Sequence, residues 1–279
     1  MERKGAQRER VLHLLEEYGG CTRDSVRRVA QETGVPEADV YGVASFYSLV
    51  RSPGERIRVC QGLSCKMMGA DRLMAELQAE GIAYEPVSCL AQCDRAPVSI
   101  DAAMELSAAA ERGGVTPDDP DLPMNLGGAD RTDYAALHRA RELGPDGVLA
   151  ELVASGLQGR GGAGFPAHIK WKAVRGEAEA TRYVVVNADE GEPGTFKDRE
   201  VMLRRPHLLL EGLAIAMEFT AATKGYLYIR GEFAEPIRRV RQALADAAEH
   251  LGHTDIEVVN GHGAYICGEE TALLEALEG

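Results

Sequence analysis

Two stretches of the sequence indicate the fold and the chemistry of the longer, C-terminal part of this chain: GLQGRGGAGFPAHIKW (residues 156–171) and YVVVNADEGEPGTFKDRE (residues 183–200). The first holds four glycines within six residues: Gly159, Gly161, Gly162 and Gly164. Glycine has no Cβ and adopts positive φ angles freely, so a phosphate or a flat ring can approach the N–H groups of such a loop closely. Phe165 follows the last glycine, and Lys170 adds a positive charge five residues later.

The second stretch starts as a strand and ends in polar side chains. Residues 183–186 are a tyrosine followed by three valines, which is typical of a strand. Four polar side chains come next: Asn187, Asp189, Glu190 and Glu192. Ligands of parallel α/β sheets bind at the carboxyl ends of the strands. Together with the glycine loop, this pattern predicts a nucleotide or flavin site, although the loop could also be a flexible connection without chemical function.

The same glycines satisfy the pattern G-x-G-x-x-G at Gly159, Gly161 and Gly164, but the rest of the dinucleotide-binding fingerprint is missing. That fingerprint requires a strand directly before the glycines. Residues 146–155 have their apolar side chains at helical spacing instead. Val184 also stands where the fingerprint requires an acidic residue. The sequence therefore predicts a nucleotide loop of another kind.

Length, composition and charge limit the class of protein. The 279 residues are 45% apolar and 27% charged, which predicts about two globular domains with sizeable cores. A net charge of −13 argues against nucleic-acid binding, which depends on positive charge. The sequence has no apolar run of the roughly 20 residues that cross a membrane and no signal peptide, so we expect a cytoplasmic protein without direct membrane insertion. Six cysteines in such a protein indicate metal or redox chemistry rather than disulfides.

Residues 1–50 predict a small helical segment. A first helix ends at Gly19 and Gly20, Thr22 caps a second that ends at Gly34, and a third spans residues 37–49. Three short helices could form a DNA-binding helix-turn-helix. Residues 1–60 carry 10 Lys and Arg against 9 Asp and Glu, so this segment is nearly neutral and that alternative is not favoured.

Two cysteine pairs follow: Cys60 and Cys65 in CQGLSC, and Cys89 and Cys93 in CLAQCDRAP. Each pair comes directly after a predicted strand (residues 56–59 and 82–87), and a helix (residues 70–80) lies between them. One βαβ unit can therefore bring the two loops side by side. Four thiolates are the ligands of a 2Fe–2S cluster, which the C-x₄-C and C-x₃-C spacings favour over structural zinc. Four unrelated buried cysteines are a third alternative.

The remainder of the chain predicts a linker and a parallel α/β sheet. Residues 106–128 are rich in Pro, Asp and Gly, which is typical of a linker. Helices and strands then alternate, as in a parallel sheet. Near the end, Gly268, Glu269 and Glu270 open a helix whose first turn has free N–H groups, although acidic residues are also ordinary at helix starts.

These motifs together resemble the NADH-oxidising flavoprotein module of respiratory complex I, and the diaphorase units of NAD-reducing hydrogenases and NAD-dependent formate dehydrogenases. The resemblance depends on the cysteine quartet and on GRGGAGFPAHIKW, NADEGEPGTFKDRE and GAYICGEETALLEALEG, which start at residues 159, 187 and 263. Residues 1–100 resemble the thioredoxin-like 2Fe–2S subunit, and residues from about 125 onward resemble the start of the flavoprotein subunit.

The resemblance implies an α/β protein with four parts. These are a helical segment (residues 1–50), a thioredoxin-like 2Fe–2S ferredoxin domain (51–105), a linker (106–128) and the N-terminal portion of a parallel α/β domain that binds FMN and NADH (129–279). Only 23 residues separate the two cysteine pairs, which implies a reduced ferredoxin domain. The family continues beyond the position of Gly279 with a ubiquitin-like domain and a 4Fe–4S helical bundle, so we expect a truncated sequence.

The resemblance also implies the residues of the sites. The cluster ligands would be Cys60, Cys65, Cys89 and Cys93. The FMN site would comprise Gly159, Gly161, Gly162, Gly164, Lys170, Asn187, Asp189, Glu190, Tyr265, Gly268, Glu269 and Glu270. Phe165 would lie near the dinucleotide, which Glu192 and Glu270 would contact.

The implied activity is NADH oxidation through FMN, with one-electron transfer to iron–sulfur clusters and no catalytic acid, base or nucleophile. The partners would be other iron–sulfur subunits of a multi-subunit redox complex. That complex could lie in the cytoplasm or be peripheral to a membrane. The alternatives are a non-catalytic 2Fe–2S electron-transfer adaptor with an incomplete flavin domain and, less favoured, a zinc-stabilised regulatory protein.

Overall fold

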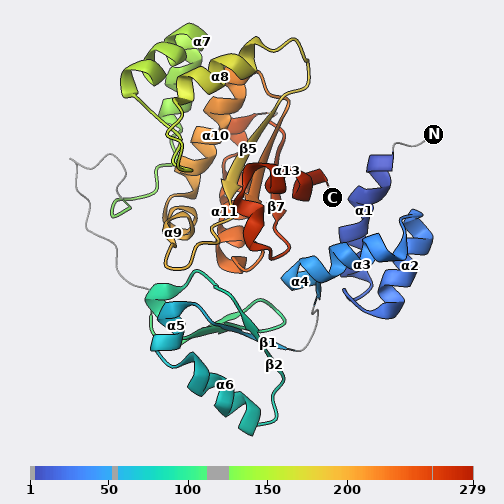
Figure 1. Ribbon diagram of the computed structural model, residues 1–279. Helices are drawn as coiled ribbons and strands as arrows, with labels where there is room; N and C mark the ends of the chain where they lie inside the picture. The colour runs from blue at the N-terminus through green and yellow to red at the C-terminus, as the bar shows by residue number, and fades with distance from the viewer. Residues whose placement is uncertain (1–3, 52–55, 112–125, 253, 279) are drawn as a thin grey trace.

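The computed structural model describes residues 4–51, 56–111, 126–252 and 254–278. A three-stranded sheet covered by helices forms the larger, C-terminal domain, and a four-stranded sheet forms a smaller domain at its lower end in Figure 1. The N-terminal helices lie to one side of the larger domain.

The N-terminal segment consists of α1 (Lys4–Glu17), α2 (Arg23–Thr33), α3 (Glu37–Phe46) and α4 (Ser48–Arg51). As predicted, Thr22 Oγ1 accepts a hydrogen bond from Ser25 N at 3.1 Å, and Gly34 ends α2 with a φ of 71°. The helix expected over residues 37–49 is interrupted, because the backbone at Tyr47 is extended (φ −83°, ψ 119°).

These helices pack against the C-terminal domain. Val11, Leu15 and Val29 share an apolar core with Tyr228 and Leu273 of that domain. The backbone adds two hydrogen bonds, from Ser48 N to Gly263 O at 2.8 Å and from Leu49 N to His262 O at 3.1 Å. The N-terminal segment therefore belongs structurally with the far end of the chain, a long-range arrangement that the local sequence pattern does not reveal.

The small domain contains β1 (Ile57–Cys60), α5 (Leu63–Met67), α6 (Ala70–Ala79), β2 (Tyr84–Val87), the 3₁₀ turn η1 (Cys93–Arg95), β3 (Val98–Ile100) and β4 (Leu106–Ala108). Its strand order is β2-β1-β3-β4, with β1 and β2 parallel and the other pairs antiparallel. The βαβ unit around α5 and α6 matches the prediction. Strand β4 continues the sheet three residues beyond the predicted domain boundary at 105. A strand of three residues is too short to show the alternation of apolar and polar side chains by which strands are predicted.

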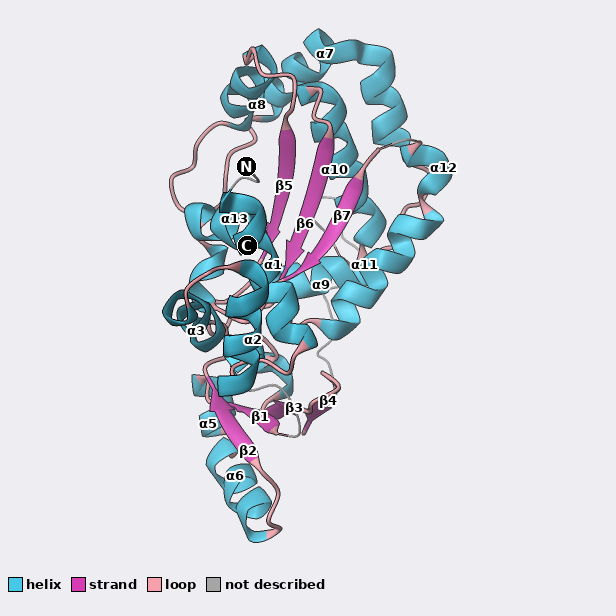
Figure 2. Cartoon of the chain, turned by 90° about the vertical axis from the view of Figure 1, so that its right-hand side faces the viewer, coloured by secondary structure: helices cyan, strands magenta, loops and turns pink. Residues whose placement is uncertain are grey.

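The C-terminal domain contains α7 (Ala135–Ser155), α8 (Ala167–Gly176), β5 (Tyr183–Ala188), α9 (Lys197–Arg204), α10 (Pro206–Thr220), β6 (Lys224–Ile229), α11 (Ala234–Asp246), α12 (Ala248–Leu251), β7 (Ile256–Asn260), η2 (Tyr265–Gly268) and α13 (Glu270–Glu278). Its strands are all parallel in the order β5-β6-β7, as predicted (Figure 2). The helical spacing noted over residues 146–155 belongs to α7, which is broken at Gly144 (φ 64°, ψ 179°).

Two layers of helices enclose the parallel sheet. Leu213 and Met217 of α10 and Val240 of α11 pack with Leu227 and Ile229 of β6 in the main core. Tyr228, the residue between, points to the opposite face, toward α1 and α13. Strand β5 lies at one edge of the sheet, and its carboxyl end leads into the acidic loop at residues 189–192.

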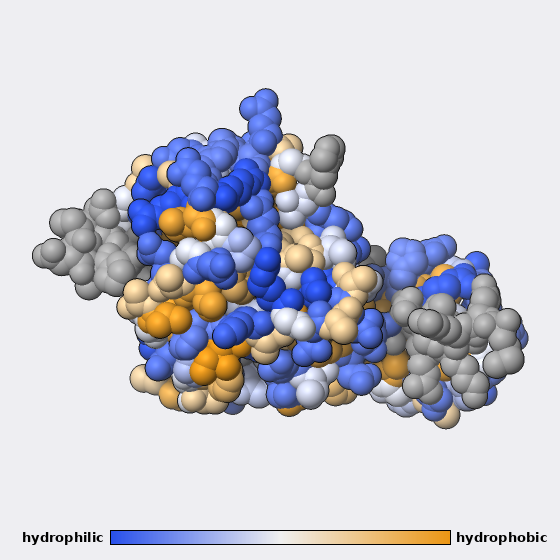
Figure 3. Space-filling view, turned by 90° about the horizontal axis from the view of Figure 1, so that it is seen from above, coloured by the Kyte–Doolittle hydropathy of each residue, from blue (hydrophilic) through white to orange (hydrophobic). Residues whose placement is uncertain are grey.

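The surface at the α7 end is largely hydrophilic, with small separate hydrophobic patches (Figure 3). None of the described helices is long and apolar enough to span a membrane.

Candidate functional site

The glycine loop joins α7 to α8 and is exposed. Gly162 and Gly164 have φ angles of 114° and 61°, which a residue with a Cβ adopts only with strain. A hydrogen bond from Gly159 N to Phe165 O, at 2.9 Å, closes the loop. Within the described residues, the N–H groups of residues 160–164 donate to no other backbone group, so they are available to an anion.

A cavity of about 440 Å³ lies beside the outer edge of β5. Lys170 and Trp171 of α8, Tyr183 and Asn187 of β5 and Glu270 of α13 are among the residues that line it. Lys170 Nζ lies 3.6 Å from Glu270 Oε1, and both side chains are exposed. The structure thus brings together three predicted site residues that are up to 100 positions apart in the sequence.

The carboxyl end of β5 is in direct contact with η2. Asn187 Nδ2 donates to Gly268 O at 2.8 Å. A Cβ at Gly268 would lie 3.0 Å from Asp189 O, and one at Gly191 would lie 3.1 Å from the ring of Tyr265. Both glycines are therefore required for this close approach. Gly191 was not among the predicted site residues, although its place within DEGEPG was a signal.

Two of the predicted acidic ligands are engaged in helix capping. Both oxygens of the buried Glu190 carboxylate accept hydrogen bonds at the start of α9, from Asp198 N at 3.0 Å and from Arg199 N at 3.2 Å. Glu269 Oε2 accepts from Thr271 N and Ala272 N, each at 3.0 Å, at the start of α13. The hydrogen bond from the Thr271 hydroxyl, followed by these two backbone bonds, lowers the pKa of Glu269. The helix-start role that the sequence left open for Glu269 is therefore present, and Glu190 has a capping role that the sequence did not indicate.

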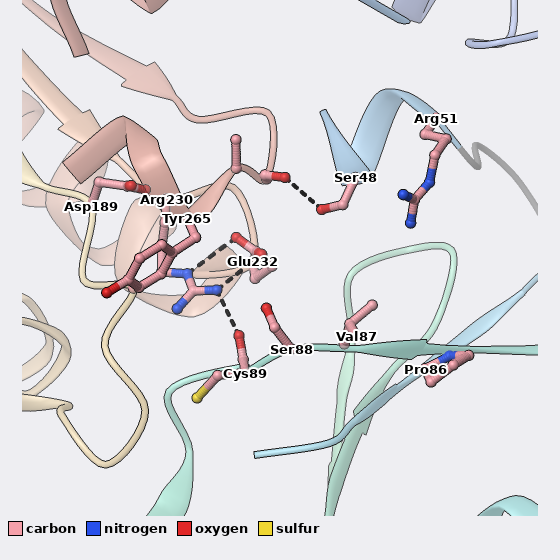
Figure 4. Close-up of a pocket in the computed structure, with 13 residues that line it drawn as sticks. Ser48, Arg51, Pro86, Val87, Ser88, Cys89, Asp189, Arg230, Glu232 and Tyr265 are labelled. Carbon is pink, nitrogen blue, oxygen red and sulfur yellow. Dashed lines mark hydrogen bonds and ion pairs between the residues drawn. The ribbon is translucent and has the colours of Figure 1, made fainter. Parts of the chain in front are cut away.

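Asp189 lines a second cavity, of about 250 Å³, at the junction of the two domains and α4 (Figure 4). Arg230, Glu232, Tyr265 and Cys89 are among the other residues of its wall. Burial raises the pKa of Asp189 to about 7, and the opposing effect of Arg230 does not cancel this rise.

The free energy of unfolding will depend on pH through Asp189. The folded pKa is raised above the ordinary value of 3.8, so the folded chain binds this proton more tightly between pH 4 and 7, and stability falls as pH rises through that window. Asp189→Asn removes this loss, so between pH 4 and pH 8 its free energy of unfolding will gain about 2–4 kcal/mol relative to that of the native chain. Urea denaturation of both chains at the two pH values measures this change. An equal change in the free energy of unfolding between the two pH values for both chains would contradict this prediction.

The four cysteines of the predicted cluster lie together. Cys60 ends β1 and Cys65 lies on α5, whereas Cys89 and Cys93 follow β2, so the parallel pair of strands brings both loops to one end of the sheet. Two of the sulfurs flank Gly62, since a Cβ there would lie 3.5 Å from Cys60 Sγ and 3.6 Å from Cys89 Sγ. The neighbouring Cys60 thiol, together with burial, raises the pKa of Cys89.

Backbone N–H groups also donate to two of these sulfurs. Gly62 N donates to Cys60 Sγ and Ala91 N to Cys89 Sγ, both at 3.4 Å. Such bonds orient thiolate ligands and tune the potential of a cluster. Among the described residues, no three His, Cys, Asp or Glu side chains are grouped to hold a single metal ion. A 2Fe–2S cluster distributes four thiolates over two irons, and this donor set of four adjacent thiols with N–H donors fits it.

Comparisons with known proteins agree with a division of the chain into a part with the four cysteines and a part with the glycine loop. Residues 1–104 match the family described as thioredoxin-like [2Fe-2S] ferredoxin, and residues 152–279 match the family described as Nuo51 FMN-binding domain. The chain is therefore similar to a thioredoxin-like [2Fe-2S] ferredoxin (here the ferredoxin domain) joined to a Nuo51 FMN-binding domain (here the FMN-binding domain). The predicted fold and family resemblance are thereby confirmed.

Individual relatives match about half of the chain. An NADH-quinone oxidoreductase subunit of Rhizobium meliloti is 49% identical over 157 residues, which cover 52% of this chain and 37% of that protein. The mitochondrial NADH-ubiquinone oxidoreductase 51 kDa subunit of Neurospora crassa is 45% identical over 159 residues, 51% of this chain and 32% of that protein. The chain therefore spans about a third of the length of these relatives.

A solved structure matches nearly the whole chain. The air-oxidised NAD⁺-reducing [NiFe]-hydrogenase has a chain that superposes with a TM-score of 0.82 at 26% sequence identity. The match covers 96% of this chain and 54% of that chain. The arrangement of the ferredoxin domain, the N-terminal helices and the FMN-binding domain thus recurs in a solved protein.

Two buried arginines were absent from the predicted site. Arg199 on α9 and Arg230 at the end of β6 belong to the FMN-binding domain, yet both hydrogen-bond to the loop that carries Cys89 and Cys93. Arg199 is part of the stretch that carries the family resemblance, but only the folded arrangement reveals its partners.

Proposed function

We propose that this chain is part of an NADH-oxidising flavoprotein subunit, in which electrons pass from FMN in the FMN-binding domain to a 2Fe–2S cluster in the ferredoxin domain. The observation that best supports this proposal is the position of Arg230. Its guanidinium donates to Glu190 O, beside the predicted flavin wall, and to Cys89 O in the predicted cluster loop. The two predicted redox sites are therefore joined by one buried side chain within a single chain.

FMN, when bound, accepts two electrons as a hydride from NADH and releases them one at a time. The residues of the chain supply binding and orientation. The free N–H groups of the glycine loop and the ammonium of Lys170 would neutralise the phosphate of FMN. Asn187 and Glu270 would provide polar contacts in the cavity beside β5. Glu190 and Glu269, with their oxygens engaged in caps, would support the wall of the site from behind.

The reaction requires no general acid or base from the protein. The four cysteines would hold the cluster through their thiolates, while the N–H groups of Gly62 and Ala91 stabilise the negative charge on sulfur. Glu192 is exposed in the acidic loop after β5 and would contact the dinucleotide. A 4Fe–4S cluster, partner iron–sulfur subunits and a location peripheral to a membrane remain predictions from the family.

Anaerobic reduction of the chain supplemented with FMN tests the flavin half of this proposal. We expect NADH to bleach the visible absorbance of bound flavin as fully as dithionite does. Bleaching by dithionite alone would support the rival function, an electron-transfer adaptor that does not oxidise NADH. Failure of the chain to quench the fluorescence of added FMN would contradict the proposed flavin site.

Phe165 provides a test of the dinucleotide site. Its side chain is 52% exposed beside the glycine loop, so its removal will change the stability of the chain little. Loss of a stacking contact worth about 1.4 kcal/mol will raise the KM for NADH about tenfold in Phe165→Ala, with FMN affinity unchanged. Leu157→Ala, which truncates another exposed apolar side chain just before the glycines, is the matched control. An unchanged KM in Phe165→Ala would place the dinucleotide elsewhere.

A further inference from the structure

Two arginines of the FMN-binding domain are buried against the ferredoxin domain. Arg199 and Arg230 are only 1% and 7% exposed. Buried cations require full pairing, because each loses its hydration when it leaves water. Their hydrogen-bond partners therefore indicate what this interface is built to hold.

Arg230 joins the loops of both redox sites. Nη1 donates to Glu190 O at 2.6 Å, and Nη2 donates to Cys89 O at 2.7 Å. Glu232 balances the charge through bonds from Nε at 3.1 Å and Nη2 at 2.9 Å. Figure 4 shows this guanidinium between Glu232 and the backbone of Cys89. Arg230 thus fixes the first residue of the cluster loop.

Arg199 holds the rest of the same loop. Nη1 donates to Ala91 O at 2.9 Å and to Gln92 Oε1 at 2.7 Å. A two-pronged ion pair joins Nη1 and Nη2 to the two carboxylate oxygens of Asp94, each at 2.9 Å. Planar pairs of this kind fix geometry as well as charge. Asp94 directly follows Cys93, so the two arginines bind the loop at or next to both of its cysteines.

The conformation of the loop depends on such support. Ala91 has a φ of 50°, in the left-handed region that residues with a Cβ occupy only at a cost. This conformation directs Ala91 N–H to Cys89 Sγ, at 3.4 Å. The carbonyl of Ala91 is the group that Arg199 binds. The hydrogen bond across the domain interface therefore stabilises the turn that presents an N–H group to sulfur.

We propose that Arg199 and Arg230 are positioning residues of the cluster site, which lock the loop of Cys89 and Cys93 onto the FMN-binding domain and favour the reduced cluster. The second part rests on the proposed function, because it requires a bound 2Fe–2S cluster. The charge of Arg230 offsets Glu232 next to Cys89. Without that cation, the Glu232 carboxylate opposes the negative charge that reduction adds to the cluster.

Hydrogen exchange of the cluster-free chain tests the lock without any cofactor. We expect Arg199→Gln and Arg230→Gln each to speed amide exchange at residues 89–94 at least tenfold, with the exchange of β5–β7 unchanged. The matched control is Arg238→Gln. Arg238 also crosses the interface, to Glu105 Oε1 at 3.4 Å, but is exposed and will leave residues 89–94 unaffected. Native exchange rates at residues 89–94 in both buried-arginine variants would overturn the proposal.

A potentiometric titration of the reconstituted cluster, followed by EPR, tests the electrostatic part. In Arg230→Gln, the ratio of reduced to oxidised cluster at a fixed potential will fall about tenfold, which is about 59 mV for a one-electron couple. Arg230→Lys keeps the charge but loses the forked contacts, so it will restore the potential while residues 89–94 still exchange fast. An unchanged potential in Arg230→Gln would refute this part.

The two measurements separate this inference from the proposed function, since NADH enters neither. If either glutamine variant fails to fold, shown by rapid exchange throughout β5–β7, the corresponding lysine variant decides the outcome. A native chain that takes up no cluster contradicts the proposed function, while hydrogen exchange still decides whether the arginines hold the loop.

Discussion

A Cys89→Ala chain will take up no stable 2Fe–2S cluster. Cys89 belongs to the thiol group: its sulfur lies beside that of Cys60 at Gly62 and accepts a hydrogen bond from Ala91 N. Alanine removes one of four ligands and supplies no replacement donor. We expect acid-labile sulfide and the EPR signal after dithionite reduction to fall from one cluster per native chain to background. Iron and sulfide analysis after anaerobic reconstitution measures the loss.

Cys21→Ala is the control for this substitution. Cys21 belongs to the N-terminal helical segment, outside the thiol group, and its replacement will leave the iron and sulfide content unchanged. Full cluster content in Cys89→Ala would show that the cluster is bound elsewhere. Stoichiometric zinc without labile sulfide in the native chain would instead identify the four thiols as a zinc site.

Gly231→Ala will strongly destabilise the chain. A Cβ at this position would overlap the carbonyl oxygen of Gly261 and lie 2.5 Å from Leu49 Cδ1. The overlapping atom belongs to the backbone that follows β7, so it cannot move aside without displacing the strand. Overpacking of this kind costs at least about 3 kcal/mol in the free energy of unfolding, measured by urea denaturation.

Gly212→Ala is the matched control for Gly231→Ala. Gly212 lies within α10, where a Cβ meets no atom within 4 Å. Alanine is the better helix former and will raise the free energy of unfolding by about 0.5–1 kcal/mol. Equal effects from the two alanine substitutions would contradict the close approach of Gly231 to the backbone of Gly261.

The local elements of the fold could be predicted because their signals lie within a few residues. Thr22 and Gly34 delimit α2, as the sequence indicated. The βαβ unit followed from the position of each cysteine pair after a strand. By contrast, β3 and β4 have three residues each, too few for a periodic pattern. The contact of the N-terminal helices with Leu273 depends on folding over more than 200 residues.

The sequence indicated which residues belong to the candidate site better than it indicated how they are arranged. The sequence placed Lys170, Asn187 and Glu270 in one site, and the cavity beside β5 brings them together. It could not decide whether Glu269 binds a cofactor or caps a helix, since the same residue type serves both roles at a helix start, and it did not foresee that Glu190 caps a helix seven residues later in the chain. Arg199 and Arg230 were missed because their role consists entirely of contacts between distant segments.

The most direct test of the account is EPR of the anaerobic chain, supplemented with FMN and reduced by NADH alone. The account predicts a 2Fe–2S signal as large as the one that dithionite produces, because electrons from NADH reach the ferredoxin domain through flavin. The signal will vanish when FMN is omitted. A 2Fe–2S signal with dithionite but none with NADH and FMN would contradict electron transfer between the two domains of this chain.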